Sequence, residues 1–494
     1  MQSLSRTLVY LVVFLDCLFF SAAQAGSLAI KGATLIDGTG ADPVKNAAIV
    51  IADGRILAAG AASQVVIPDG MNVVDGRGKF IIPGLMDANL HLHLNRDLET
   101  LIKFEGRYHE IVIEAAQITL RAGQTTVFDT WGPRAALARA RDMIDAGEVP
   151  GSRIYLAGNI IGYGGPFSSD FNPAAAAHVS KVFAQRTDAA WEQGTGQALL
   201  WANPEEVRQA VRNYADLGID FLKYGASGHE LLEMRFISFS PRVQQIIIEE
   251  GHRAGLTVQA HTSTTESLDM ALDAGVDIIT HCDVSGTDTP LADETIRKLA
   301  ERKIPCSVLP VTQRRYEAML AADPDDPMAG YIRTMKINHR KMIDAGVVML
   351  VATDGGIRNP VLAAEATGIA AVEVDSRTTL GEGLFNALVA LQELGMRPME
   401  LLRAVTSNTA RAYKKDQTIG TLEPGKAGDL VILDRNPLVD AAHYRSIHAV
   451  VKDGNLVDRE ALPLAPLISS MVVPIKRDDA NGGPTSPNPP TKVR

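Results

Sequence analysis

The sequence predicts an α/β fold, in which a (β/α)8 TIM barrel is joined to a small β domain that both ends of the chain build. Short apolar β-type runs alternate with helical stretches through the middle of the chain, whereas only short strands and turn residues stand at its two ends. The 494 residues are enough for one large domain and a smaller one. We therefore expect the small domain at residues 26–82 and 416–466 and the barrel at residues 83–415.

The first 25 residues have the pattern of an export signal. Arg6 precedes an apolar stretch from Leu8 to Phe20, and the small residues after it resemble a signal-peptidase site. The stretch is short for a membrane-spanning helix and contains Asp16, which is costly inside a bilayer. We expect residues 1–25 to be cleaved and the mature chain to be periplasmic or secreted, without membrane attachment; an uncleaved anchor is the alternative.

The mature chain opens with short β-type runs divided by Asp37-Gly38 and Asp53-Gly54, which are turn signals. Similar runs return near the C-terminus. These runs cover residues 28–35, 47–51, 55–59, 429–434 and 448–454. The two sets predict one small β domain.

Eight strands are expected in the barrel. They cover residues 81–93, 125–129, 153–160, 219–224, 257–261, 277–281, 304–309 and 347–353. Between them, residues 204–217, 241–254 and 264–274 have the apolar spacing of helices. The stretch 162–196, rich in Gly, Ala and Ser, is too long for a plain connection, and we expect it to cover the site.

The first barrel strand carries polar residues at alternate positions. Asp87, Asn89, His91 and His93 share one parity, so they share one face of a strand. Imidazole is a common metal ligand, and two ligands spaced by two residues on a strand can converge on one ion. Histidines at a wet strand end are the alternative, but an apolar strand has no other reason to carry them.

Four further polar residues stand at or just after the C-terminal ends of expected strands, where a TIM barrel carries its chemistry. They are Lys223, His261, His281 and Asp354. Each alone is more often a solvated cap. Together they indicate a site, because unrelated polar residues would not gather at the same end of the strands.

Composition limits the classes of partner and cross-link. The net charge of −10 argues against a nucleic-acid partner, since phosphate binding needs a basic surface. Cys17 would leave with the signal, so the mature chain keeps Cys282 and Cys306. We expect no disulfide framework, and a bond between these two is the remaining alternative. Residues 467–494, rich in Pro, Gly and Asn, are expected to be a disordered tail.

Four motifs carry a resemblance to a known family. They are Ala-Thr-Leu-Ile-Asp-Gly at 33–38, Ile-Pro-Gly-Leu-Met-Asp at 82–87, Ile-Gly-Thr-Leu-Glu-Pro-Gly-Lys-Ala-Gly-Asp at 419–429 and Val-Lys-Asp-Gly at 451–454. With them nearly the whole mature chain resembles the metal-dependent amidohydrolase superfamily, in the branch similar to imidazolonepropionases and Xaa-Pro dipeptidases. The resemblance implies a TIM barrel, a β-sandwich built from both termini, one or two divalent ions, Zn²⁺ being expected, a small-molecule substrate and a homo-oligomer.

The resemblance also implies metal ligands. Carried over by position they are His91, Lys223, His261, His281 and Asp354, with Lys223 carboxylated where it bridges two ions. The family's His-x-His pair would fall on positions 89 and 91, yet Asn89 stands first. We favour Asn89 and His91 as the pair, because a slip by two residues to His91 and His93 would need a bulge.

The implied function is that of a metal-dependent hydrolase of an amide, peptide or cyclic C–N bond. Hydroxide generated at the metal would attack the carbonyl, with Asp354 as general base and acid. Tyr163, Tyr224 and His229 are candidate substrate contacts, for which ordinary loop packing is the alternative. A deaminase or lactonase on the same scaffold is a second interpretation, and a non-catalytic binding protein on a decayed barrel is a third.

Overall fold

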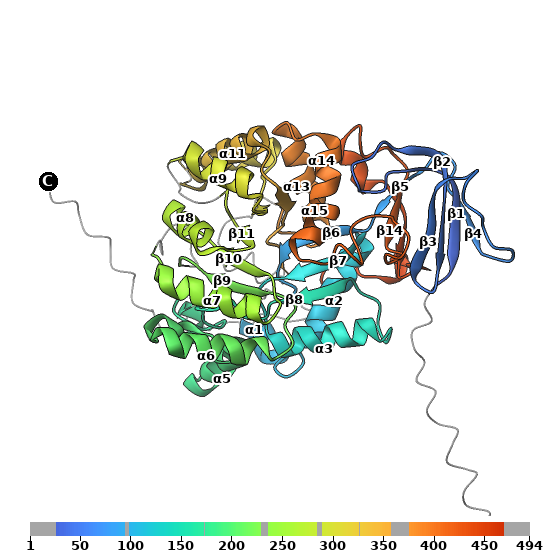
Figure 1. Ribbon diagram of the computed structural model, residues 1–494. Helices are drawn as coiled ribbons and strands as arrows, with labels where there is room; N and C mark the ends of the chain where they lie inside the picture. The colour runs from blue at the N-terminus through green and yellow to red at the C-terminus, as the bar shows by residue number, and fades with distance from the viewer. Residues whose placement is uncertain are drawn as a thin grey trace, which may run out of the picture.

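A computed structural model of the protein describes residues 26–93, 98–171, 173–228, 236–283, 289–325, 327–356 and 375–468. The predicted signal, His229 and the tail from residue 469 lie outside these ranges. The fold is α/β, with a small sheet on one side of a larger unit of parallel strands and helices (Figure 1). Among the described residues, no helix is both long and apolar enough to cross a membrane.

Both ends of the chain meet in the small sheet. Its strands are β1 (Leu28–Leu35), β2 (Val44–Ala52), β3 (Arg55–Ala61), β4 (Val73–Asp75), β5 (Phe80–Pro83), β14 (Leu430–Leu433), β15 (Ile447–Lys452) and β16 (Asn455–Leu456). β5 joins the two sets, because it pairs with β1 on one side and with β14 on the other. The strand order is β16-β15-β14-β5-β1-β2-β3, with β4 on β1. The described strands thus form one hydrogen-bonded path, and the expected β-sandwich stays a prediction.

The larger unit contains two parallel sheets, β6-β7-β8 and β13-β12-β11-β10-β9. Their strands are β6 (Leu85–Leu90), β7 (Gln124–Asp129), β8 (Arg153–Leu156), β9 (Leu222–Gly225), β10 (Val258–His261), β11 (Ile278–Thr280), β12 (Cys306–Val308) and β13 (Met349–Val351). Each lies within or close to one of the eight predicted runs, and most are shorter.

Isolated bridges link the edges of the two parallel sheets. Ile161, after β8, bridges to Tyr224 of β9, and His91, after β6, bridges to Gly356, after β13. The His91 amide donates to the Gly355 carbonyl at 2.8 Å. These links bring the ends of β6 and β13 together, but the described strands form two ladders and not one closed ladder.

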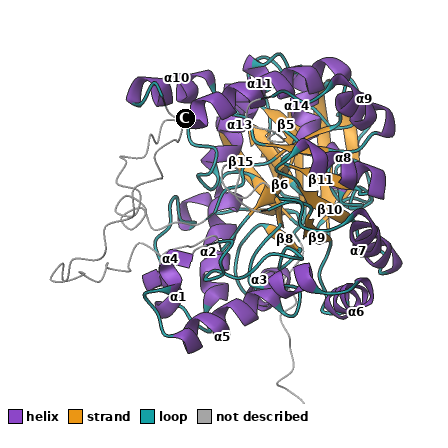
Figure 2. Ribbon diagram, turned by 90° about the vertical axis from the view of Figure 1, so that its left-hand side faces the viewer, coloured by secondary structure: helices purple, strands orange, loops and turns teal. Residues whose placement is uncertain are grey.

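Helices surround the parallel strands (Figure 2). They are α1 (Leu98–Lys103), α2 (Tyr108–Arg121), α3 (Arg134–Asp145), α4 (Pro173–Ala176), α5 (Lys181–Glu192), α6 (Pro204–Ala215), α7 (Pro241–Arg253), α8 (Thr265–Ala274), α9 (Asp293–Arg302), α10 (Gln313–Ala322), α11 (Pro327–Ala345), α13 (Glu382–Glu393), α14 (Pro398–Ala404) and α15 (Ser407–Ala412). Short 3-10 helices cover Gln197–Trp201, Ala441–Arg445 and Arg459–Ala461. The three helices predicted by range are α6, α7 and α8, and each begins after a side-chain cap, Asn203, Ser240 and Thr264.

The single strand expected at residues 81–93 is wrong. The chain changes sheets at Gly84, where β5 ends in the small sheet and β6 begins in the larger unit. The Gly84 amide donates to the Asp429 carbonyl at 3.0 Å, and a Cβ at this position would lie 2.0 Å from the Thr125 hydroxyl oxygen. Only glycine allows this approach. β6 then ends at Leu90, so strand parity cannot orient His93.

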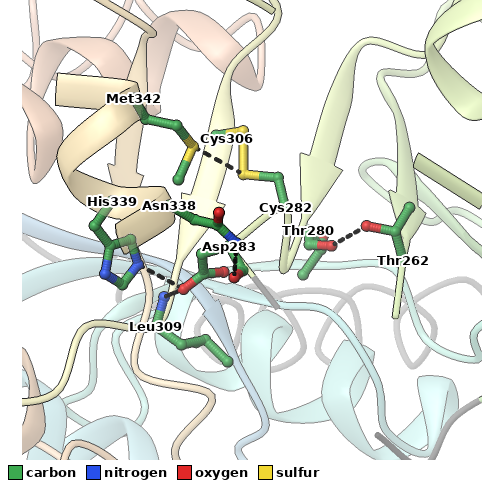
Figure 3. The surroundings of a disulfide bond; sticks show 9 residues. All are labelled: Thr262, Thr280, Cys282, Asp283, Cys306, Leu309, Asn338, His339 and Met342. Atoms are coloured by element: carbon green, nitrogen blue, oxygen red, sulfur yellow. Dashed lines mark hydrogen bonds and ion pairs between the residues drawn. A yellow bond between two sulfur atoms is a disulfide. The ribbon is translucent and has the colours of Figure 1, made fainter. Parts of the chain in front are cut away.

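Cys282 and Cys306 form a disulfide that links the segment after β11 to the start of β12 (Figure 3). The next residue, Asp283, is fully buried and accepts from the His339 ring at 2.6 Å and the Leu309 amide at 2.8 Å. The bond that the sequence left as an alternative is therefore present, in a segment that α11 also fixes through His339.

Candidate functional site

The polar residues predicted at the strand ends lie at one end of the parallel sheets. Asn89 is on β6, Lys223 on β9 and His261 at the end of β10, whereas His281 directly follows β11 and Asp354 is the third residue after β13. His281 and Asp354 both adopt positive φ, 63° and 52°, in a region that non-glycine residues rarely occupy. Both therefore leave their strands at sharp turns.

Asp354 is the centre of the hydrogen-bond network. Its Oδ1 accepts from Asn89 Nδ2 at 3.0 Å and from His91 Nε2 at 3.0 Å, and His281 Nε2 lies 3.9 Å away. Burial alone would raise the pKa of this carboxyl, but His281, His91 and Arg377 together hold the pKa well below its ordinary value. Asp354 is therefore a carboxylate at neutral pH.

Asn89 connects this carboxylate to a buried lysine. Lys223 Nζ donates to Asn89 Oδ1 and to the Thr130 hydroxyl, each at 3.1 Å, and Thr130 also donates to Asn89 Oδ1. Lys223 is 1% exposed, and burial lowers the pKa of its ammonium to about 8. A fraction of the amine is therefore neutral near pH 7.

The imidazoles of the site are buried. The rings of His261 and His281 lie edge to face, with centroids 4.9 Å apart. Burial lowers the pKa of His281 to about 4 and also lowers the pKa of His91. Both rings are therefore neutral at pH 7, which is the form that binds a metal ion.

His93 points elsewhere. Its ring packs against Tyr108 and Trp191, with centroids 4.6 Å and 5.2 Å away. Neither ring nitrogen has a hydrogen-bond partner among the described residues, and burial lowers the pKa of this histidine to about 3. The structure brings Asn89 and His91, but not His93, into the network around Asp354.

The predicted substrate contacts lie in different places. Tyr163 packs its ring against His261, with centroids 5.5 Å apart, and donates its hydroxyl to the Ser227 carbonyl at 2.6 Å. Tyr224 is fully buried and donates to Gln244 of α7 at 3.0 Å, so it faces the helices and not Asp354. His229 lies outside the described residues.

Sequence reasoning missed Thr130, Asp129 and Arg377. Asp129 ends β7 and accepts from the amides of Leu92 and Trp131 at 2.6 Å and 3.2 Å, which fixes the turn after β6. The strand-end rule could have found Asp129 and Thr130, because residues 125–129 were a predicted strand. Arg377 stands in none of the sequence motifs.

The donor set fits a divalent metal ion. His281 Nδ1 is buried and has no hydrogen-bond partner among the described residues, and neutral imidazoles with a carboxylate are ordinary zinc ligands. Within the described part of the chain, no three or more His, Cys, Asp or Glu side chains lie close enough to share one ion. The chemistry of the donors therefore fits better than their spacing.

Comparisons with known proteins extend over most of the chain. The structure of molinate hydrolase is similar over 93% of this chain and 99% of its own, with 37% identity and a TM-score of 0.85. An imidazolonepropionase from Geobacillus sp. (strain WCH70) is 25% identical over 450 residues, which is 84% of this chain and 90% of the relative. A Xaa-Pro dipeptidase structure with 22% identity and a TM-score of 0.68 covers 87% of this chain and 100% of its own, and shows the shared fold.

These relatives confirm the resemblance that the sequence motifs indicated. The match to a protein-family model is equally broad, since it includes β5, the parallel strands β6 to β13 and the C-terminal strands β14 to β16 of the small sheet. Residues 80–457 match the amidohydrolase family, and the chain belongs to it.

Proposed function

We propose that the protein is a metal-dependent hydrolase that cleaves an amide or related C–N bond of a small molecule. The observation that supports this most is the arrangement of Asn89, His91 and His281 around one carboxylate oxygen of Asp354. The relatives named molinate hydrolase and imidazolonepropionase support hydrolysis of a small substrate.

The residues proposed to hold the ion are His91, His261, His281 and Asp354. When bound, a divalent ion acts as a Lewis acid that polarises a carbonyl group and lowers the pKa of water. Asp354 is the proposed proton carrier, because it is ionised at neutral pH and a carboxylate can accept a proton from water. The water oxygen adds to the carbonyl carbon, the C–N bond breaks, and the proton passes from Asp354 to the leaving nitrogen.

One ion per chain is the proposed stoichiometry. Lys223 donates to Asn89 and Thr130, so as an ammonium it is already paired and would repel a nearby cation. Carboxylation would turn Lys223 into an anionic bridge for a second ion, and the lowered pKa of its amine makes the neutral form needed for that reaction accessible.

The proposal extends to the architecture and location. The bridges between Ile161 and Tyr224 and between His91 and Gly356 support a closed eight-stranded barrel. The proposal that the small sheet folds as a sandwich rests on the family resemblance. The Cys282–Cys306 disulfide is compatible with export to an oxidising compartment. Mass spectrometry of the mature protein tests cleavage after residue 25, and light scattering tests the homo-oligomer.

The decisive experiment measures metal and activity on the same purified protein. Elemental analysis should find about one divalent ion per chain, and two would support carboxylated Lys223. A screen of N-acyl amino acids, dipeptides, ureas, carbamates, cyclic ureides and lactones should detect hydrolysis of a C–N bond. A protein that holds metal but hydrolyses only lactones would contradict the proposed bond class, and one without metal or activity would favour a decayed barrel.

Variants separate the roles. His261→Ala and His281→Ala should lose metal and activity together, since each removes a proposed ligand. Asp354→Asn should keep most of the metal but lower kcat about 100-fold to 10,000-fold, because it removes a proton acceptor. Full metal content in either alanine variant would show that the ligand assignment is wrong, whereas equal metal loss in Asp354→Asn would make Asp354 chiefly a ligand.

A further inference from the structure

His281 leaves its strand in a backbone conformation that its neighbours have to maintain. It directly follows β11, and its φ of 63° lies in a region that residues other than glycine rarely occupy. Such a conformation persists only where the surrounding structure holds it. The ring Nε2 lies 3.9 Å from Asp354 Oδ1, so this turn places the imidazole at the proposed metal site.

A disulfide restrains the residue that follows His281. The His281 amide donates to the Ser307 carbonyl at 3.0 Å, and Cys282 is the first residue beyond this bond. Cys282 is joined to Cys306 of β12 (Figure 3), and both residues are fully buried. Cys306 already pairs with Ile279 in the ladder between β11 and β12. The two strands therefore do not need the disulfide to stay adjacent, and what the disulfide adds is a restraint on the turn after His281.

Asp283 fastens the far side of the same turn. Its Oδ2 accepts from the Leu309 amide at 2.8 Å and from the His339 ring at 2.6 Å, and its backbone carbonyl accepts from Asn338 Nδ2 at 3.0 Å. Leu309 follows β12, whereas Asn338 and His339 belong to α11. The carboxylate is fully buried, so water does not compete for these hydrogen bonds. The turn is thus held by two neighbouring elements, and the disulfide is the covalent part of this brace.

Metal binding is sensitive to the position of each ligand. A zinc ion binds an imidazole nitrogen at about 2.0–2.1 Å, and its ligands have to be held within about 0.5 Å of the productive geometry. Within the described ranges, the His281 Nδ1 forms no hydrogen bond, so the turn and the packing against His261 set the position of the ring. Release of the turn would therefore let the ring move relative to the other proposed ligands.

We infer that the Cys282–Cys306 disulfide is a positioning element for His281, so that the oxidised chain binds the metal ion more tightly than the reduced chain. The inference rests on the proposed function and adds a condition to it, namely that the metal site is complete only once the disulfide has formed. Neither sulfur is a proposed ligand, and neither takes part in the hydrolysis. The disulfide acts through the backbone of the turn, together with the hydrogen bonds of Asp283.

The test measures the metal affinity of the purified protein by competition with a chelator. Cys282→Ala combined with Cys306→Ala removes the disulfide without leaving a thiol that binds the ion or a buried hydroxyl without a partner. The dissociation constant for Zn²⁺ should rise about 10-fold to 100-fold, since loss of groups that orient a metal ligand has an effect of this size. An unchanged dissociation constant in the folded double variant would overturn the inference and leave the proposed function intact. A wild type that binds no metal would instead contradict the proposed function itself.

Glu250→Gln is the control for a general loss of stability. Glu250 of α7 forms ion pairs with Arg208 and Arg212 of α6, and neither helix carries a proposed ligand. At a temperature where both proteins stay folded, this variant should bind Zn²⁺ as tightly as the wild type does. If its dissociation constant rises as much as that of the cysteine double variant, the effect is one of stability alone and the inference is overturned.

Reduction of the wild type keeps the test decisive even if the double variant does not fold. A phosphine reductant and water break the S–S bond, each sulfur gains a hydrogen atom, and the phosphine becomes its oxide. The reduced protein should bind Zn²⁺ more weakly, and oxidised glutathione, which takes up the two hydrogen atoms as it forms two thiols, should restore the affinity. Thiols that reached the ion would strengthen binding, which is the opposite sign. Unchanged or tighter binding after reduction would therefore overturn the inference.

Discussion

Asn89 combines two functions that a single imidazole at this position would serve less well. An amide has an acceptor and a donor, so Asn89 accepts one hydrogen bond from Lys223 and donates one to Asp354. The buried Lys223 ammonium and the partly exposed Asp354 carboxylate are thereby joined through one neutral group. This contact makes Asn89 part of the charge balance of the site, whether or not its oxygen also contacts a metal ion.

Metal stoichiometry of three variants tests the role of each position. His91→Ala should lose most of the metal, whereas His93→Ala should keep it, because the His93 ring packs against Tyr108 and Trp191 and not against Asp354. Asn89→His should tighten metal binding, since imidazole is a better ligand than an amide. Elemental analysis measures all three.

The unfolding midpoint in urea provides the control for the same set. His93→Ala should lower the free energy of unfolding by about 1–3 kcal/mol, because it leaves a cavity in an aromatic cluster. Comparable metal loss in His91→Ala and His93→Ala, with no gain in Asn89→His, would contradict the pairing of Asn89 with His91.

Residues of the site could be predicted where the fold puts them at a regular position. Lys223, His261, His281 and Asp354 were found because strand ends can be read from apolar runs. Arg377 could not be found in this way, since its place depends on packing between α13 and the turn at Gly355. His93 was assigned to the wrong face because the sequence does not show that β6 ends at Leu90.

At the scale of elements, apolar runs predicted where strands lie better than where they end. The run predicted at 153–160 forms a strand only over Arg153–Leu156, yet Ile160 remains buried after the chain has left the sheet. An apolar run therefore predicts that a segment is buried, but not that all of it is a strand. To form a strand, the segment also needs a neighbouring strand with which to make hydrogen bonds.

Helices α6 and α7 are held together by one buried carboxylate. Glu250 of α7 is 2% exposed and accepts from Arg208 and Arg212 of α6 and from Arg253 of its own helix. The hydrogen bond from Arg212 is the largest cause that lowers the pKa of Glu250 to about 2. This ionic contribution to the helix pair is present only while Glu250 is ionised.

Glu250→Gln should lower the free energy of unfolding at pH 7 by about 2 kcal/mol, because the charge-assisted bonds are lost. The folded-state pKa lies below that of the unfolded chain, so this stabilisation is complete above about pH 4.5 and disappears as the pH falls toward 2. Urea unfolding of both proteins from pH 7 to pH 3 measures it. Glu249→Gln on the exposed side of α7 is the control, and a difference that stays constant with pH would contradict the ionic origin.

At the scale of the molecule, the meeting of the two chain ends was predictable, because both carry the same short strands and turns. The pairing partner of each strand in the small sheet could not be predicted, because the pairing depends on β5, which joins β1 to β14. The contact between the first residues of the predicted tail and α2 could not be predicted either. The amides of Leu467 and Ile468 donate to Glu114 of α2 at 2.6 Å and 2.7 Å. Long-range contacts of this kind leave no local pattern.

The Cys282–Cys306 bond is the covalent link between β11 and β12, and it gives the last prediction. It closes a loop with a sequence separation of 24 residues, for which loss of the cross-link should lower the free energy of unfolding by about 3 kcal/mol. Reductant should therefore lower the unfolding temperature of the wild type, whereas Cys306→Ser should unfold at the lower temperature with or without reductant. Thiol titration of the denatured mature protein should detect no free thiol before reduction. Two free thiols in the unreduced protein, or an unfolding temperature that reductant does not change, would show that the two cysteines are not joined.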